Sequence, residues 1–243
     1  MRANINLIHG DCMEAMREMK DESIDLIITD PPYNIGQSNK RTKVGDKIIS
    51  NKEAWGEWDD FDNKEFDEFM FNLLKECKRI LKEGASFYCF TAREKNGFYC
   101  DYACHNLGFT YQNTIAMIKE NPLPRFTKTN WRIAFELAFY ISKGKPKTFN
   151  FINQQKMVNV QKYVIGKKES THPTEKPLKV FKLLIEASSN EKDLVLDPFM
   201  GSGTTAISCW DLKRDCITYD TSKEYYDKAC DRLKRHQSQG QLF

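Results

Sequence analysis

The sequence lacks several features that mark membrane, secreted and metal-binding proteins. No apolar run approaches the roughly 20 residues that cross a bilayer, and residues 1–5 hold no apolar core of a secretory leader. The eight cysteines contain no Cys-x-x-Cys pair, and Cys100, Cys104 and His105 have no fourth ligand at a zinc spacing. We therefore expect a cytoplasmic protein with reduced thiols, without a metal and without a membrane partner.

A length of 243 residues, of which 40% are hydrophobic and 29% charged, suits one globular α/β domain with insertions, here the whole span 1–243. Apolar runs alternate with segments of helical period, which predicts a mostly parallel sheet with helices on both faces. Strands are expected at residues 6–9, 24–29, 85–91, 109–119, 133–142, 193–196 and 216–219. Helices are expected at 12–19, 64–82, 93–107, 203–211 and 222–236, with another that starts between 173 and 177 and ends at 188.

The middle of the chain departs from this alternation. Gly84 is expected to end the helix over 64–82. The runs 109–119 and 133–142 have no helix between them, so we predict an antiparallel pair at the edge of the sheet. Residues 143–170 show no strong period and are expected to be an irregular insertion.

Charge is distributed unevenly, although its net value is only +3. Between Lys119 and Lys168 there are eleven Lys and Arg residues but only two acidic residues, Glu120 and Glu136. Aromatic residues are interspersed among them, at Phe126, Trp131, Tyr140, Phe149, Phe151 and Tyr163. Basic blocks with aromatic residues are typical of surfaces that bind phosphates, which indicates a nucleic-acid-binding insertion at 120–170.

Residues 34–63 form a long segment rich in Asn, Lys, Gly and Asp with weak periodicity. A loop of this length inside a compact domain is typical of a lid or a binding loop, or of plain disorder. Basic residues near its start, Lys40, Arg41, Lys43 and Lys47, favour a mobile loop that contacts nucleic acid, with disorder as the alternative.

Two motifs follow predicted buried strands. Asp30-Pro31-Pro32-Tyr33 ends the strand over 24–29, and Asp197-Pro198-Phe199-Met200-Gly201-Ser202-Gly203-Thr204-Thr205 ends the strand over 193–196. Parallel sheets bind ligands at the carboxyl ends of their strands, and glycines let a ligand approach the backbone closely. Two such motifs predict two ligands held face to face.

Together the two motifs resemble the catalytic and cofactor motifs of the S-adenosylmethionine-dependent DNA amino-methyltransferases. The order of the motifs, Asp-Pro-Pro-Tyr first and the Gly-rich turn last, resembles the permuted beta class of that family. The resemblance implies a Rossmann-like methyltransferase sheet with circularly permuted motifs and an antiparallel pair at its edge. It also implies that residues 120–170 recognise the target sequence.

Asp30, Pro31, Pro32 and Tyr33 are the expected catalytic residues. The exocyclic amine of a base is a poor nucleophile because its lone pair is delocalised, so a catalyst must accept hydrogen bonds from the amine and aim it. The Asp30 carboxylate and the Pro31 carbonyl can accept them, and the prolines stiffen the turn. Tyr33 offers a ring on which a base flipped out of the duplex can stack.

The resemblance implies that the second motif surrounds S-adenosylmethionine, through Asp197, Phe199, Gly201, Ser202, Gly203 and Thr204. Asp220 ends the next strand and is spaced like the acid that binds a ribose hydroxyl in dinucleotide folds. Thr174 and Lys176 would bind the cofactor carboxylate, although a helix cap by Thr174 accounts for the same pattern. Asp11 would meet the cofactor's adenine or cap the following helix.

DNA is the expected partner. Arg125, Lys128 and Arg132 are the candidates for phosphate contacts within the basic block. The target amine is inaccessible inside a duplex, so we expect the base to be flipped out. The resemblance also allows a homodimer.

Residues 237–243 form a polar tail that ends in an apolar pair. Its Gln239, Leu242 and Phe243 resemble the short peptides by which bacterial replication and repair proteins bind the sliding clamp. Chance similarity, or packing of the tail against the chain itself, is the simpler alternative.

The sequence therefore predicts a site-specific DNA methyltransferase that modifies N6 of adenine. Cytosine N4 is the nearest alternative because both amines need the same acceptors, and relatives that act on cytosine tend to begin the motif with Ser rather than with an Asp such as Asp30. Enzymes acting on RNA or on protein amides usually carry the two motifs in the opposite order. A non-catalytic nucleic-acid-binding module is a further alternative, which failure to bind S-adenosylmethionine would favour.

Overall fold

The fold is a single mixed sheet flanked by helices, seen in a computed structural model that describes residues 3–33, 42–44, 47–49, 63–124, 129–165 and 175–239, with the backbone alone for 42–44 and 47–49. The strands are β1 (Ile5–His9), β2 (Ile24–Thr29), β3 (Thr42–Val44), β4 (Lys47–Ile49), β5 (Leu81–Thr91), β6 (Thr110–Lys119), β7 (Phe135–Ser142), β8 (Val160–Tyr163), β9 (Leu194–Asp197) and β10 (Asp215–Asp220). The helices are α1 (Cys12–Glu18), α3 (Asn63–Ile80), α4 (Asn96–His105), α5 (Leu178–Ser188), α6 (Thr204–Leu212) and α7 (Lys223–Gln239).

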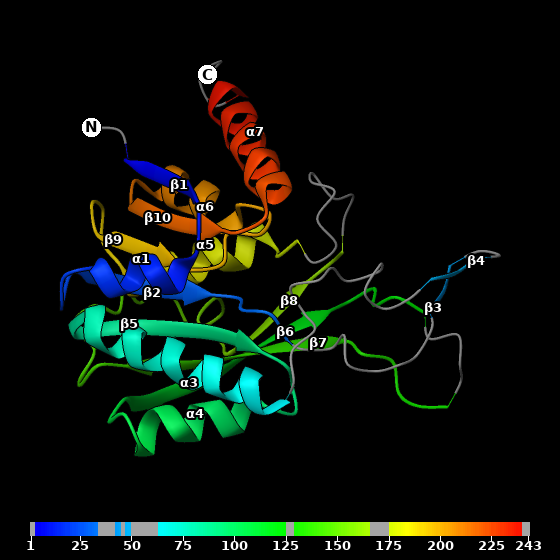
Figure 1. Cartoon of the computed structure of the whole chain (residues 1–243), viewed down its shortest axis with the longest axis horizontal. Coiled ribbons are helices and arrows are strands. Elements are labelled where there is room, and N and C mark those ends of the chain that lie inside the picture. Colours follow the sequence, from blue (N-terminus) through cyan, green and yellow to red (C-terminus); the bar gives the residue numbers. More distant parts are fainter. Residues whose placement is uncertain are drawn as a thin grey trace.

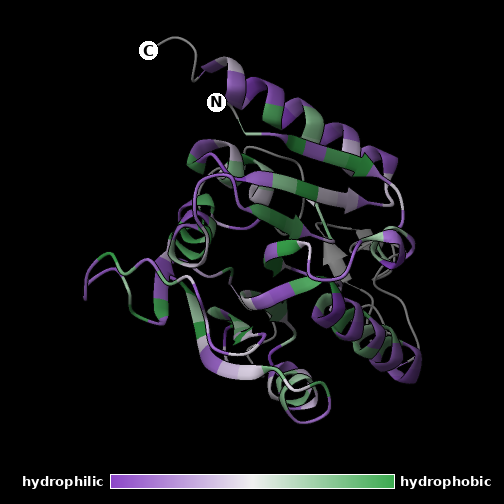
Figure 2. Ribbon diagram, turned by 90° about the vertical axis from the view of Figure 1, so that its left-hand side faces the viewer, coloured by the Kyte–Doolittle hydropathy of each residue, from purple (hydrophilic) through white to green (hydrophobic). Residues whose placement is uncertain are grey.

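Helices cover both faces of the sheet because its central strands are apolar on both sides (Figure 1). On β2, Ile27 faces α1, α3 and α4, whereas its neighbours Leu26 and Ile28 face α5 and α6. Side chains alternate between the faces of a strand, so a strand buried on both sides must be apolar throughout. Figure 2 shows this contrast between largely hydrophobic central strands and the hydrophilic helix α7.

The sheet has the strand order β1-β10-β9-β2-β5-β7-β6-β8. Five neighbouring strands run parallel, namely β1, β10, β9, β2 and β5. Their carboxyl ends therefore lie at the same end of the sheet. The chain leaves β2 toward β5 on one side and leaves β9 toward β10 on the other. This reversal of winding between neighbouring strands opens a crevice at their carboxyl ends. The two motifs therefore lie side by side.

The antiparallel strand β7 has its amino end beside these carboxyl ends. It pairs with β5 on one side and with β6 on the other, antiparallel in both cases. Glu136 near the start of β7 and Lys119 at the end of β6 consequently lie beside the crevice. The predicted antiparallel pair is confirmed, but its position at the edge was wrong.

The outermost strand is β8, which pairs parallel to β6 and lies within the segment expected to be irregular. Its four residues, Val160–Tyr163, alternate between exposed and half-buried positions, so they carry no continuous apolar run. Two other boundaries differ from the prediction. β5 begins at Leu81, directly after α3, because Leu81 pairs with Ile24, and Gly84 lies inside β5 with a φ of +80°. α7 continues to Gln239, so the expected polar tail begins later.

The segment 34–63 contains a short antiparallel strand pair, β3 and β4, within its described part. Figure 1 shows this pair to the right of the sheet, beyond β6 and β7. Across the described ranges, no helix is long and apolar enough to cross a membrane.

Candidate active site

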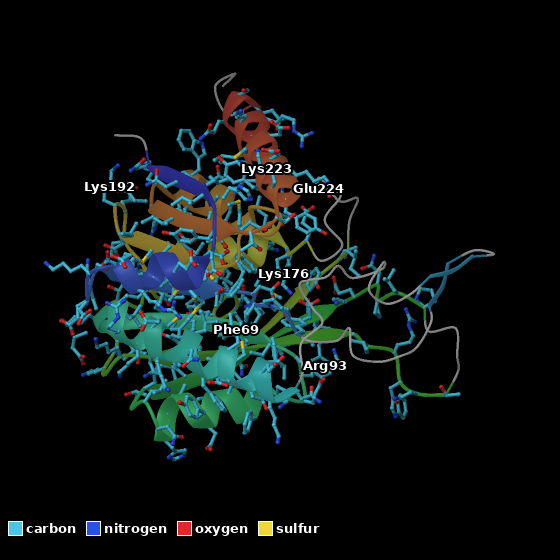
Figure 3. All side chains as sticks on the ribbon, in the orientation of Figure 1. Phe69, Arg93, Lys176, Lys192, Lys223 and Glu224 are labelled. Carbon is cyan, nitrogen blue, oxygen red and sulfur yellow. The ribbon has the colours of Figure 1, made fainter. Side chains whose placement is uncertain are left out.

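The carboxyl ends of the central strands surround a cavity of about 350 Å³. Both motifs line it, together with residues that follow β1 and β10. Phe69 of α3 and Lys176, which precedes α5, also line it, and both are labelled in Figure 3. Apolar atoms make up most of this lining. The site is therefore a largely apolar pocket with a few charged groups directed into it, which is typical of a small-molecule site.

Asp30 lies at the end of β2, and both of its carboxylate oxygens have partners. Oδ1 accepts a hydrogen bond of 2.5 Å from the Tyr33 hydroxyl, and Oδ2 lies 3.0 Å from Nζ of Lys176. The Lys176 ammonium also donates to the Tyr33 hydroxyl at 3.1 Å. The Asp-Pro-Pro-Tyr turn thus folds back on itself, with Lys176 bridging its two ends.

Asp30 begins a series of four charged side chains of alternating sign, of which the first two line the cavity. Lys176 contacts Glu136 of β7 with 2.6 Å between Nζ and Oε2. The other oxygen of Glu136 lies 2.5 Å from Nζ of Lys119 on β6. Lys176 is only 8% exposed, so its charge is compensated by protein carboxylates rather than by water. We call the series Asp30–Lys176–Glu136–Lys119 the charge chain.

The charge chain sets the protonation of its members. Burial raises the pKa of Asp30, and the Lys176 ammonium opposes that effect. Burial would also raise the pKa of Glu136, but the ammonium groups of Lys176 and Lys119 outweigh it and lower that pKa to about 2. Burial lowers the pKa of Lys176, yet the neighbouring Asp30, Tyr33 and Glu136 raise it well above its ordinary value. Lys176 is therefore a fixed positive charge that favours the ionised form of Asp30.

The Gly-rich turn after β9 is organised by Asp197. Its carboxylate accepts hydrogen bonds from the Phe199 amide at 3.1 Å and from the Thr205 hydroxyl at 2.5 Å. Burial nevertheless raises the pKa of Asp197 to about 7, although both hydrogen bonds oppose the increase. These contacts lie within the turn itself, so Asp197 shapes the loop that borders the cavity.

Asp220 and Asp11 occupy the neighbouring strand ends. Asp220 accepts hydrogen bonds from the amides of Gly201 and Ser222 at 3.1 and 2.8 Å, which tie the turn after β9 to the end of β10. Asp11 caps α1 by accepting from the Met13 amide at 2.6 Å, and it also lines the cavity. Both roles expected for Asp11 are thus compatible with its position.

Arg232 of α7 is a buried residue that the sequence interpretation missed. It donates to the Ser202 carbonyl at 3.0 Å and to the Thr204 hydroxyl at 3.2 Å, and it pairs with Glu175 at 2.7 Å. It therefore fastens the Gly-rich turn to the residue before Lys176. The available signal was its place on the buried stripe of α7, directly before Leu233.

A family model described as DNA methylase, for N6 and N4 methyltransferases, matches residues 24–231. The match includes both motifs and the charge chain. The chain belongs to this family. It is one of the S-adenosylmethionine-dependent DNA amino-methyltransferases, as the two motifs had suggested.

Individual relatives agree with this assignment. The type II methyltransferase M.HinfI of Haemophilus influenzae is 34% identical over 96% of this chain and 71% of its own length. The crystal structure of the M1.HpyAVI–SAM complex superposes with a TM-score of 0.71 and 26% identity, covering 94% of this chain and 98% of that one. The cytosine-N4-specific PvuII DNA methyltransferase has a TM-score of 0.74 at 18% identity, over 98% of this chain and 92% of that one, and shows that the fold is shared.

The residues around the cavity fit S-adenosylmethionine. The rings of Phe69 and Phe199 pack edge to face with 6.1 Å between their centroids and offer an apolar wall. Asp220 presents a carboxylate next to the backbone of Gly201, whose φ of +50° lies in the region that favours glycine. An adenosine with its ribose hydroxyls needs this combination of apolar surface and hydrogen-bond acceptor.

The structure brings most of the predicted site residues to this cavity. Those that line it are Asp11, Asp30, Pro31, Pro32, Tyr33, Lys176, Asp197, Phe199, Gly201, Ser202, Thr204 and Asp220. Gly203 is set back from the cavity, with its α-carbon against α7. Lys176 contacts Asp30 of the catalytic motif and Glu136 of β7, and its expected contact with the cofactor carboxylate stays a prediction. Thr174 lies outside the described residues.

The described residues of the basic block, within 119–124 and 129–165, do not form one continuous surface. Lys119 belongs to the charge chain, and Lys143 and Lys147 lie at the opposite edge of the sheet, where their backbones pair with Gly84. Arg132 and Lys162 are exposed near the crevice edge. The predicted contacts by Lys40, Arg41, Arg125 and Lys128 fall outside the described residues, as does the side chain of Lys43.

Two expectations about partners stay predictions. Gln239 ends α7, and the remainder of the clamp-like peptide, Leu242 and Phe243, lies outside the described residues. The homodimer allowed by the family resemblance is not tested by a single chain.

Proposed function

We propose that this methyltransferase transfers a methyl group from S-adenosylmethionine to N6 of adenine within a specific DNA sequence, with the target base flipped out. The observation that carries the proposal is the placement of Asp30 and Tyr33 at the strand end next to the Gly-rich turn, so that a base and a cofactor can meet in one cavity. The similarity to a type II methyltransferase supports a role in restriction and modification.

When bound, S-adenosylmethionine supplies an electrophilic methyl group. Asp220 and the turn at Gly201 would hold the adenosine, while Phe199 packs against it. The Asp30 carboxylate accepts a hydrogen bond from the target amine and localises its lone pair. Its raised pKa makes it a better proton acceptor than an exposed carboxylate.

Tyr33 has a second task in this scheme. In the structure the Tyr33 hydroxyl donates a hydrogen bond to Oδ1 of Asp30. The target amine needs the same oxygen as its hydrogen-bond acceptor. A base that stacks on the Tyr33 ring therefore replaces the hydroxyl at that oxygen. Lys176 remains at Oδ2 and keeps the carboxylate aimed.

DNA binding would involve the crevice edge formed by the ends of β6, β7 and β8. Arg132 and Lys162 provide positive charge there, and Trp131 is 89% exposed. Positive charge beside an exposed aromatic ring suits a surface that binds phosphates and stacks on bases.

The test is incubation with unmethylated duplex DNA and S-adenosylmethionine, followed by digestion to nucleosides and mass spectrometry. We expect N6-methyldeoxyadenosine from the wild type and a loss of at least about 100-fold in Asp30→Ala, because removing one preorganised hydrogen-bonding group from an active site costs roughly 10²–10³ in rate. N4-methyldeoxycytidine in its place would overturn the choice of base and leave the family assignment intact. Cofactor binding without any methylated nucleoside would count against DNA as the substrate.

A further inference from the structure

Glu136 is an acid inside a basic block, far in sequence from both motifs. It is one of two acidic residues between Lys119 and Lys168, yet it faces the active site rather than solvent. Its carboxylate has two cationic partners, Lys176 at 2.6 Å and Lys119 at 2.5 Å. Removing a carboxylate from water costs free energy, and only well-placed charged partners offset that cost. The position of Glu136 between two lysines therefore indicates a specific role.

Without Glu136, the Lys176 side chain could adopt more than one conformation. A lysine has four rotatable bonds and an ammonium that binds as a point charge. The cavity offers it Asp30, the Tyr33 hydroxyl and the space beside the Gly-rich turn. Contact with Glu136 holds the ammonium on the side of Asp30.

We infer that Glu136 is a positioning residue for methyl transfer, which fixes Lys176 against the carboxylate of Asp30. Lys119 in turn fixes Glu136 from the adjacent strand. The inference rests on the proposed function, since it assigns a role in the same reaction. It also assigns the Lys176 ammonium to the Asp-Pro-Pro-Tyr turn rather than to the carboxylate of the cofactor.

The mechanism of the effect is geometric. Asp30 has to present one oxygen to the target amine while the other oxygen stays occupied, and Lys176 occupies it at 3.0 Å. Displacement of reacting groups by about 1 Å can cost roughly 100-fold in rate. Loss of Glu136 should therefore slow the chemical step and leave cofactor binding unaffected.

The decisive variant is Glu136→Gln, which keeps the size of the side chain and removes its charge. We expect the single-turnover rate of methyl transfer, at saturating DNA and S-adenosylmethionine, to fall roughly 10- to 100-fold. The Kd for S-adenosylmethionine, measured by titration calorimetry, should change less than about twofold. Asp211→Asn is the matched control, because Asp211 also bridges two side chains, the Lys182 ammonium at 2.5 Å and a ring nitrogen of His236 at 2.7 Å, away from the cavity.

A double-mutant cycle tests whether Glu136 acts through Lys176. In a Lys176→Met background, Glu136→Gln should slow methyl transfer by less than about threefold further, because the group that it positions is already absent. Lys119→Met provides an independent variant should Glu136→Gln fail to fold, and we expect it to slow the same step.

Three results would overturn the inference. The first is an unchanged single-turnover rate in Glu136→Gln with an active wild type. The second is an equal loss of rate from Glu136→Gln with and without Lys176, and the third is a large loss of cofactor affinity, which would place Lys176 at the cofactor. A wild type that methylates no DNA would overturn the proposed function and the inference with it.

Discussion

At the scale of single residues, burial determines how Asp197 responds to pH. Its pKa is raised to about 7, whereas an aspartate in the unfolded chain titrates near its ordinary value of about 3.9. Between these two values the folded state keeps a proton that the unfolded state releases. The contribution of Asp197 therefore favours folding at low pH, and it is lost as the pH rises through about 7.

Asp197→Asn should remove this dependence. The amide can still accept from the Phe199 amide and can donate to Thr205, so the turn keeps its hydrogen bonds. We expect the variant to gain stability relative to the wild type as the pH increases from 5 to 8, as measured by urea unfolding at each pH. A difference between the two proteins that stays constant over this range would show that Asp197 titrates normally.

Residue types alone indicated the family through the two motifs but could not predict the charge chain. Asp30 and the Gly-rich turn are local sequence patterns with known chemistry. Glu136 and Lys119, in contrast, reach the site only because β7 runs antiparallel between β5 and β6. Nothing in the sequence near Glu136 indicates that its partner is Lys176.

At the scale of elements, the contact between α6 and α7 depends on Gly203. This residue precedes α6 with a φ of +78°, and a Cβ there would lie 3.2 Å from Cβ of Ala229 on α7. Gly108 has a comparable φ of +68° but open space around it. The two glycines thus share the backbone conformation and differ in their surroundings.

We expect Gly108→Ala to lower the free energy of unfolding by roughly 1–2 kcal/mol through backbone strain alone. Gly203→Ala should lose more, since α7 must also move away from α6. Urea unfolding of the two variants gives the comparison. An equal loss of unfolding free energy in the two variants would mean that α7 moves without a measurable cost in stability.

Most element positions could be predicted from periodicity, and the errors have physical causes. The central strands and the helices α3, α5 and α7 have strong apolar patterns that can be recognised in the local sequence. β8 has only four residues and pairs with β6 through its backbone, which leaves no apolar signature. The boundary between α3 and β5 was misjudged because pairing of Leu81 with Ile24 overrides the preference of Gly84 for a helix end.

At the scale of the whole molecule, the sheet separates the basic residues into two groups. Arg132 and Lys162 lie toward the crevice, while Lys145 and Lys147 lie toward the opposite edge. All four are exposed, and each pair adds two basic residues to the net charge. Of these two pairs, we expect Arg132 and Lys162 to contact DNA that delivers a base to the cavity.

Substituting the two pairs separates local contact from general attraction. We expect Arg132→Ala with Lys162→Ala to weaken DNA binding and to reduce the slope of log K against log salt by about 1–2, since each phosphate contact contributes roughly 0.9. Lys145→Ala with Lys147→Ala serves as the charge-matched control and should leave the slope unchanged. Fluorescence anisotropy over a salt series measures both. Similar changes in the two variants would indicate that DNA is attracted by net charge alone.

The strand pair β6 and β7 has a consequence for how sequence specificity can diversify. The amide of Lys119 donates to the carbonyl of Ala134 at 2.7 Å, which closes the connection between the strands at its base. The half-buried charges Lys119 and Glu136 therefore lie at the two ends of the segment that connects β6 to β7. We expect that segments of different length can connect β6 to β7 at this point, and that Lys176 and Asp30 keep their places as long as Lys119 and Glu136 are retained.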